Sequence, residues 1–371
     1  MKRIAIDARI WRAESGGIGR YCRNLVTEIL KLDTENEYTV ILTTKDEAEF
    51  NLSAPNLKKL VLDIPHYSIA EQRDLPSILN KEKFDLVHFT HFNHPLFYRR
   101  PFVVTVHDII LHLFPVGNQS KFKRLVYKAV MNDTRRGKVI YAVSEATKKD
   151  LVSLLKFPEN KLQVTLEGGE ERFHVHTKAE QDAIKKKLQL PEQYILFVSR
   201  WEKYKGISAL VPAFQELSKE FPDLGLVICG KPWKHAPEVA DMIRKAQADG
   251  YNIITPGFVS DEDLAPLYSA ATVYCHPSWY EGFGIMILEA FASGVPTVTS
   301  NISSLPEVAG NAALLVNPHS ITEITAAIRR ILTEPELAAT LRARGLERVK
   351  RFSWKKMAEE TIAGYHKALK D

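Results

Sequence analysis

Short apolar runs alternate with stretches of helical periodicity along the whole chain. In the first half, strand-like runs lie at 2–7, 38–43, 84–90, 102–106, 139–143 and 162–166, and helical spacing marks 24–32, 121–136 and 145–155. Because crossover helices connect parallel strands, this alternation predicts an α/β fold built on a doubly wound parallel sheet.

The same alternation starts again after a polar stretch at 167–181. Strand-like runs follow at 194–199, 224–229, 252–255, 272–275, 296–299 and 312–316, with helices beginning near 207 and spanning 237–248, 321–332, 336–348 and 354–369. At 371 residues the chain is also too long for one ordinary hydrophobic core. We therefore expect two α/β domains, 1–172 and 173–352.

The composition of the chain indicates in which cellular compartment the protein is expected. The chain is 45% hydrophobic and 26% charged, which is typical of a soluble protein, and no apolar run approaches the ~20 residues of a membrane-spanning helix. Asp7 interrupts the apolar start of the chain, so no signal-peptide core forms there. The three cysteines are scattered without metal-like or redox-like spacing. These features predict a cytoplasmic protein.

Positive charge is concentrated at 97–149, where 11 Lys and Arg residues face 3 Asp and Glu residues. Such a block indicates an anionic surface or ligand, and a solvated helix face is the alternative. Within it, 121–136 has the pattern of a basic amphipathic helix. That pattern fits either peripheral contact with an anionic membrane or an ordinary surface helix packed on a sheet.

Two features of the first half are candidates for a binding site. Gly16, Gly17 and Gly19 are expected in a long loop after the first strand, where a ligand can approach the backbone closely; a plain tight turn is the alternative. The third glycine of a dinucleotide fingerprint would fall at Cys22, so that motif fails. His107 ends the strand-like run at 102–106, opposite the glycines, where ligands of α/β sheets collect.

The second half carries a stronger combination. Arg200 and Lys205 follow a strand and precede a helix, a placement that suits a diphosphate but also occurs in surface loops. Glu281 and Glu289 flank a glycine-rich turn and a helix N-terminus, where backbone N–H groups attract anions and carboxylates accept hydrogen bonds from sugar hydroxyls. Together these residues predict a nucleotide-sugar site.

Two further clusters have the composition of metal sites. His88, His91 and His94 recur at three-residue spacing, but no carboxylate or cysteine completes the set. Asp261-Glu262-Asp263 matches the Asp-x-Asp pattern that holds a divalent ion in some sugar transferases. It fits better as the acidic first turn of a helix capped by Ser260. We predict no metal site.

Residues 276–300 resemble the signature of glycosyltransferase family 4, a retaining group, because Glu281 and Glu289 reproduce its Glu-x7-Glu spacing. Thr105-Val-His-Asp108 occupies the place of the family's active-site histidine. The start Ile-Asp-Ala-Arg, with Gly-Gly-Ile-Gly-Arg-Tyr, is similar to mannosyltransferase-type members that extend bacterial surface polysaccharides. The resemblance covers the whole chain and implies a GT-B fold: two Rossmann-like domains facing a central cleft, with the helix at 353–371 packed back onto the first.

The resemblance also implies residue roles. Arg200 and Lys205 would neutralise the diphosphate leaving group, so that no metal or other cofactor is required. Glu289 would accept the ribose hydroxyls, and Glu281 would hold the transferred sugar together with the distal phosphate. His107 would contact the donor sugar near its reacting carbon. The implied catalytic set is His107, Arg200, Lys205 and Glu281; the donor-binding set adds Gly17, Gly230, Phe258, Gly282, Phe283, Gly284, Ile285 and Glu289; the acceptor-binding set is Gly16, Gly19, Arg20 and Tyr21.

The expected function is therefore retaining transfer of a hexose to a saccharide or lipid-linked saccharide acceptor, with mannose from GDP-mannose favoured. Lys205 and Glu289 are expected to face solvent in the cleft. The region 97–149 is the candidate contact with the inner face of the cell membrane, and no nucleic acid is expected as a partner. The alternatives are a UDP-sugar transferase of the same family, a nucleotide-sugar 2-epimerase, an NAD-dependent Rossmann oxidoreductase and a catalytically silent binding module.

Overall fold

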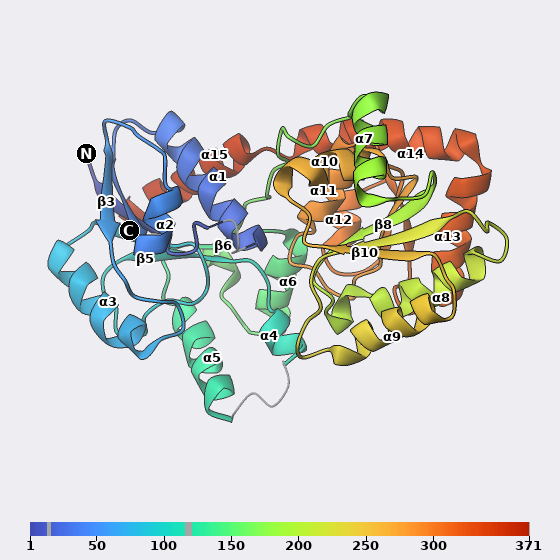
Figure 1. Ribbon diagram of the computed structural model, residues 1–371. Coiled ribbons are helices and arrows are strands. Elements are labelled where there is room, and N and C mark those ends of the chain that lie inside the picture. Colours follow the sequence, from blue (N-terminus) through green and yellow to red (C-terminus); the bar gives the residue numbers. More distant parts are fainter. Residues whose placement is uncertain (13–15, 116–120, 371) are drawn as a thin grey trace. The chain divides into compact units, whose positions relative to one another are not determined.

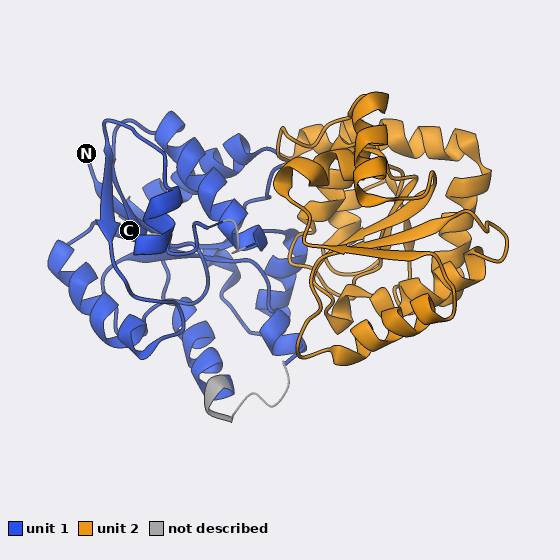
Figure 2. Cartoon of the chain, in the orientation of Figure 1, with its two compact units in different colours: residues 1–168, 353–371 blue, residues 169–352 orange. Residues whose placement is uncertain are grey.

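A computed structural model describes residues 1–12, 16–115 and 121–370 (Figure 1). The chain forms two compact units. Unit 1 contains residues 1–168 and 353–371, and unit 2 contains residues 169–352 (Figure 2). The chain therefore enters unit 2 once and returns to unit 1 for its last helix.

Unit 1 is built on a parallel sheet with the strand order β3-β2-β1-β4-β5-β6-β7. Its strands are β1 (Arg3–Asp7), β2 (Glu37–Leu42), β3 (Leu57–Val61), β4 (Leu86–Phe89), β5 (Phe102–Val106), β6 (Ile140–Ala142) and β7 (Leu162–Val164). Its helices are α1 (Gly16–Leu32), α2 (Thr44–Glu49), α3 (Ile69–Glu82), α4 (Ile110–Leu113), α5 (Lys121–Thr134), α6 (Glu145–Ser153), the 3-10 turn η2 (Glu159–Lys161) and α15 (Trp354–Lys370).

Unit 2 repeats the plan with the order β10-β9-β8-β11-β12-β13, again parallel throughout. Its strands are β8 (Tyr194–Val198), β9 (Gly225–Cys229), β10 (Ile253–Gly257), β11 (Val273–His276), β12 (Thr297–Ser300) and β13 (Ala313–Val316). Its helices and 3-10 turns are α7 (Lys178–Leu188), η3 (Lys203–Lys205), α8 (Ile207–Leu217), α9 (Pro237–Ala248), α10 (Asp261–Ser269), α11 (Ile285–Ala292), α12 (Leu305–Ala309), α13 (Ile321–Thr333), α14 (Pro335–Arg348) and η4 (Val349–Arg351).

The expected α/β class with doubly wound parallel sheets is confirmed. The inner strands are buried along most of their length, as β5 and β9 illustrate, because helices cover both faces of each sheet. In each sheet the strand order reverses once, between β1 and β4 and between β8 and β11. Ligands of such sheets bind beyond the carboxyl ends of the strands at this switch point.

Two local expectations were wrong, and two elements were not predicted. Gly16, Gly17 and Gly19 form the first turn of α1 instead of a long loop. The segment 303–310, expected as a turn, contains the short helix α12. Strand β3 and helix α3 gave no clear apolar signal, because β3 is an edge strand whose two lysines are exposed and α3 buries only a narrow face.

Helix α15 packs within unit 1 against α1 and the sheet. The hydroxyl of Tyr365 is hydrogen-bonded to His88 Nδ1 at 2.6 Å, and Tyr141 OH donates to Thr361 O at 2.8 Å. Gly364 permits this approach, since a Cβ there would lie 2.2 Å from Tyr141 OH.

Among the described residues, no helix combines the length and apolar character that crossing a bilayer requires.

Gly364→Ala should lower the free energy of unfolding of unit 1 by about 1–2 kcal/mol. Overpacking costs roughly 1–3 kcal/mol, whereas alanine returns at most about 1 kcal/mol of helix propensity. Gly17→Ala is the matched control, because the same exchange in α1 meets no heavy atom within 4 Å. Urea denaturation followed by circular dichroism measures both variants. Equal stability of Gly364→Ala and the wild type would contradict the packing described here.

Candidate functional site

In unit 2, the segments after β8 and β11 meet at the switch point. The backbone N–H of Trp279 donates to Tyr204 O at 2.7 Å, and Ser278 Oγ donates to the same oxygen at 3.1 Å. Gly206 makes the approach possible: its φ is 79°, and a Cβ there would lie 1.9 Å from the carbonyl oxygen of Pro277. The two loops are therefore joined by backbone contacts before any charged group is considered.

A buried cluster of charge lies between these loops. Lys205 Nζ donates to both carboxylate oxygens of Glu281 at 2.8 Å, and His276 Nε2 donates to Glu281 Oε1 at 2.8 Å. Lys205 and Glu281 are 7% and 6% exposed, and His276 is fully buried. Burial would raise the pKa of Glu281, but Lys205 and His276 lower it to about 2. Glu281 is therefore a fixed anion, and each of its two carboxylate oxygens already accepts at least one hydrogen bond.

The turn that follows Glu281 is held by two serines. Ser303 Oγ and Ser304 Oγ donate to Glu281 O at 2.7 and 2.9 Å, and Ser304 Oγ also donates to Phe283 O at 2.7 Å. Gly284, with φ of 104°, then starts α11. The first N–H groups of a helix have no partner within it, so Phe283, Gly284 and Ile285, all of them buried, form a helix end of the kind that can bind an anion.

Glu289 and Lys205 are both buried, so the expectation that they face solvent was wrong. Glu289 is 5% exposed on α11 and lies beside Tyr268. Burial raises the pKa of Tyr268 well above its usual value, and the nearby Glu289 carboxylate raises it further. Neither Glu289 nor Lys205 can therefore be replaced without disturbing buried neighbours.

Arg200 is one of the exposed cations of this region, together with Lys203 and Lys231. Its side chain is 62% exposed, with Nε 3.1 Å from Glu202 Oε1 and the guanidinium 5.0 Å from the centre of the Trp233 ring. The ends of β9 and β10 lie close by. Gly230 has φ of 117°, and its N–H donates to Gly257 O at 2.9 Å, while the neighbouring Phe258 ring is 74% exposed. An exposed aromatic ring at this edge can stack on a base.

In unit 1, His107 follows β5 and is held on several sides. Its Nε2–H donates to Thr90 O at 2.9 Å, and its Nδ1 lies 3.4 Å from Glu167 Oε1. Tyr21 packs edge-on against the imidazole, with ring centroids 4.7 Å apart, and its hydroxyl is hydrogen-bonded to Thr105 Oγ1 at 2.9 Å. The side chain of His107 is therefore fixed in orientation.

The other glycine-segment residues divide by exposure. Gly16 and Gly17 are exposed, and no heavy atom lies within 4 Å of a Cβ built on either, so a ligand can approach this backbone. Gly19 and Tyr21 are buried, and Arg20 is half-buried. Tyr21 therefore supports His107 from behind instead of contacting an acceptor directly.

The two metal-like patterns have structural roles. His88 is bonded to Tyr365 and Thr105, and His94 to Phe92 O and Asp133. Ser260 caps α10 by accepting from the N–H of Asp263, whose carboxylate pairs with Lys187 at 2.8 Å. Within the described ranges, no group of three or more His, Cys, Asp or Glu side chains could hold a metal ion.

Family models match both units. The model of Glycosyltransferase Family 4 matches residues 15–168, and the model of Glycosyl transferases group 1 matches residues 178–348. The O-antigen chain mannosyltransferase B of Escherichia coli is 31% identical over 83% of this chain and 81% of its own length. The chain belongs to glycosyltransferase family 4.

Two further proteins resemble this glycosyltransferase. The serotype-specific mannosyltransferase WbdA of Escherichia coli is 30% identical over 72% of the chain, which matches only 33% of that longer relative. Sucrose-phosphate synthase from Thermosynechococcus elongatus has the same fold, with a TM-score of 0.77 at 22% identity over 99% of this chain and 98% of its own.

Three features of the glycosyltransferase were missed in the sequence. His276 was noted only as part of the motif, although its place at the end of β11, five residues before Glu281, was a usable signal. Glu167 begins the polar stretch at 167–181, and its proximity to His107 depends on tertiary packing. The buried contact of Arg9 with Glu71 joins residues 62 positions apart, which no local pattern reveals.

Glu281→Gln should lower the free energy of unfolding by about 3 kcal/mol at neutral pH, since a carboxyl whose pKa falls from 4.5 to about 2 stabilises the folded state by about that amount. The stabilisation is present above pH 4.5 and is lost as the pH falls toward 2. The difference between variant and wild type should therefore shrink over that window. Denaturant titrations at stepped pH values measure it, with Glu262→Gln on the exposed face of α10 as the control. A difference that does not change with pH would contradict this assignment.

Proposed function

We propose that this glycosyltransferase transfers mannose from GDP-mannose to a saccharide or lipid-linked saccharide, with retention of configuration and without a metal ion. The observation that carries the proposal is the Lys205–Glu281–His276 cluster at the switch point of unit 2, beside the N-terminus of α11. The choice of mannose rests on the relatives, two of which are mannosyltransferases by name.

The leaving diphosphate is the group that needs stabilisation. Arg200 offers an exposed guanidinium, and Lys205 keeps a third N–H donor beyond the two that bind Glu281. The N–H groups that start α11 complete the set. Donors fixed before the reaction stabilise developing negative charge by several kcal/mol, on the order of 3 kcal/mol for each well-placed group. A diphosphate held in this way requires no metal ion to leave.

Glu281 is unsuited to act as the nucleophile, because both its oxygens are hydrogen-bonded and its pKa is about 2. We therefore infer same-face attack by the acceptor hydroxyl. The bond between the sugar carbon and the phosphate oxygen breaks as the bond to the acceptor oxygen forms. The hydroxyl proton passes to the departing diphosphate. Glu281 then holds the sugar, Glu289 holds the ribose, and His107 contacts the donor sugar near its reacting carbon.

The alternatives have less support. Membership of family 4 does not favour a nucleotide-sugar 2-epimerase, an NAD-dependent oxidoreductase or a silent binding module. A UDP-sugar donor within the same family is the competing proposal, and a direct comparison of donors decides between the two.

GDP-mannose should raise the melting temperature more than UDP-glucose or ADP-glucose, and with EDTA present it should be hydrolysed slowly without an acceptor. Arg200→Ala should reduce turnover roughly 100-fold, because it removes one charged donor to the leaving group. Arg244→Ala, which removes an exposed arginine on α9, is the control that should leave turnover unchanged. Hydrolysis of a UDP-sugar only would contradict the choice of GDP-mannose as the donor. Stabilisation by NAD without hydrolysis of any nucleotide sugar would contradict the proposed function.

We also propose peripheral contact with an anionic membrane through α5. Leu125 and Val126 are 65% and 37% exposed on this helix, and Arg124 and Lys128 beside them are exposed as well. Exposed leucine and valine beside basic side chains are typical of helices that lie on a membrane surface.

The protein should float with vesicles of phosphatidylglycerol and phosphatidylethanolamine at low salt, and salt should weaken the binding because it screens the basic residues. Leu125→Glu should abolish flotation. Leu154→Glu, which alters another exposed leucine of unit 1, should not. Recovery of the wild type only in the soluble fraction would reject the membrane contact.

A further inference from the structure

Tyr67 presents an exposed aromatic ring at the carboxyl edge of the first sheet. It lies in the loop between β3 and α3, and the residue is 65% exposed. Its φ is 60°, in the left-handed region that residues other than glycine rarely adopt. Such strain collects at ligand sites, because the surrounding structure has to hold it in place.

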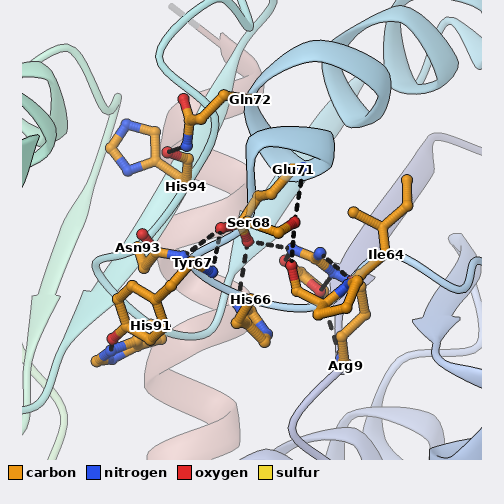
Figure 3. Close-up of polar contacts among 12 residues, drawn as sticks. Arg9, Ile64, His66, Tyr67, Ser68, Glu71, Gln72, His91, Asn93 and His94 are labelled. Carbon is orange, nitrogen blue, oxygen red and sulfur yellow. Dashed lines mark hydrogen bonds and ion pairs between the residues drawn. The ribbon is translucent and has the colours of Figure 1, made fainter.

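A buried carboxylate holds the strained residue. The backbone N–H of Tyr67 donates to Glu71 Oε2 at 2.7 Å, and Asn93 Nδ2 donates to the same oxygen at 2.6 Å (Figure 3). Arg9 Nη2 donates to Glu71 Oε1 at 2.8 Å, and Arg9 Nη1 donates to Ile64 O at 2.8 Å. Both ends of the loop are thus fixed by one pair of opposite charges.

The charges of Arg9 and Glu71 are paired inside the protein. Arg9 also binds both carboxylate oxygens of Asp7, at 2.8 and 2.7 Å, and its side chain is fully buried. Burial would raise the pKa of Asp7, but Arg9 lowers it, so both groups remain ionised. Arg9 therefore offers no donor to an incoming phosphate, and the surface around Tyr67 suits an uncharged ligand.

The ring of Tyr67 begins a row of rings that leads to His107. Tyr67 OH is hydrogen-bonded to His91 Nε2 at 2.8 Å (Figure 3), and the His91 and His107 ring centroids are 6.1 Å apart. Burial, followed by the nearby His107, lowers the pKa of His91 well below its usual value, so His91 is neutral at neutral pH. All of these residues belong to unit 1.

The row crosses the switch point of the first sheet. Arg9 follows β1, and His91 and Asn93 follow β4, which are the two strands between which the order reverses. The proposed donor residues are nearly all in unit 2, so this edge of unit 1 is available to the other substrate. We propose that Tyr67, supported by His91, is a platform on which a neutral acceptor saccharide stacks. This inference rests on the proposed function only in naming the bound saccharide as the acceptor.

The chemistry fits a sugar. A pyranose ring has an apolar face of C–H groups and a rim of hydroxyls, and tyrosine presents an aromatic face of matching character. Mannotriose serves as the probe, and saturation-transfer NMR measures its binding. Tyr67→Gly, which also relieves the backbone strain, should weaken binding about tenfold. Tyr67→Phe and Tyr67→Trp keep an aromatic face but lose the hydroxyl that contacts His91, so they should bind more weakly than the wild type and more tightly than Tyr67→Gly. Leu154→Ala, which alters another exposed apolar side chain of unit 1, should bind as the wild type does.

Equal binding of mannotriose by the wild type and Tyr67→Gly would overturn the platform, as would absence of binding to the wild type. Donor hydrolysis in the same samples separates this inference from the proposed function. Hydrolysis of GDP-mannose without Tyr67-dependent binding of mannotriose would reject the platform and leave the proposed function intact. If mannotriose binding depends on Tyr67 but no nucleotide sugar is hydrolysed, the proposed function would be rejected, and Tyr67 would still mark a saccharide-binding site.

Discussion

The candidate donor site depends on one buried ion pair. Lys205 comes from the segment after β8 and Glu281 from the segment after β11, so their contact joins the two strand ends where the sheet order reverses. A buried ion pair contributes little net stability compared with apolar packing, because both charges lose their hydration. Its effect is geometric: a partner left alone in this environment would be costly, so the two loops are held in one arrangement.

Unit 1 uses the same device with different residues. Arg9, after β1, binds Asp7 and Glu71, and Glu71 in turn holds the N–H of Tyr67 and the amide of Asn93. In both units a buried charged network therefore fixes loops at the switch point. The networks differ in what lies exposed beside them: the Arg200 guanidinium in unit 2 and the Tyr67 ring in unit 1. That difference suits a charged donor and a neutral acceptor.

Interpretation of individual residues changed with their surroundings. Lys205 was expected as an open cation for the diphosphate, and it is instead buried and bound to Glu281, whereas the Arg200 side chain is exposed. Tyr21 was expected to contact an acceptor, and it is buried behind His107. In both cases the residue type was consistent with the expected role, and burial altered what the side chain can reach.

Patterns in the amino-acid sequence were enough to predict the α/β class, most of the strands and the Glu281–Glu289 motif. These depend on apolar periodicity and short-range spacing, which are local properties of the chain. The same patterns did not indicate that Glu167 faces His107 or that Arg9 reaches Glu71, because those contacts join distant segments. Nor did they reveal that Tyr67 is exposed and strained, since exposure follows from the packing of β3 and α3, whose apolar signal is weak. Which charges are buried together, and which aromatic ring stays exposed, depends on how distant segments pack in the folded chain.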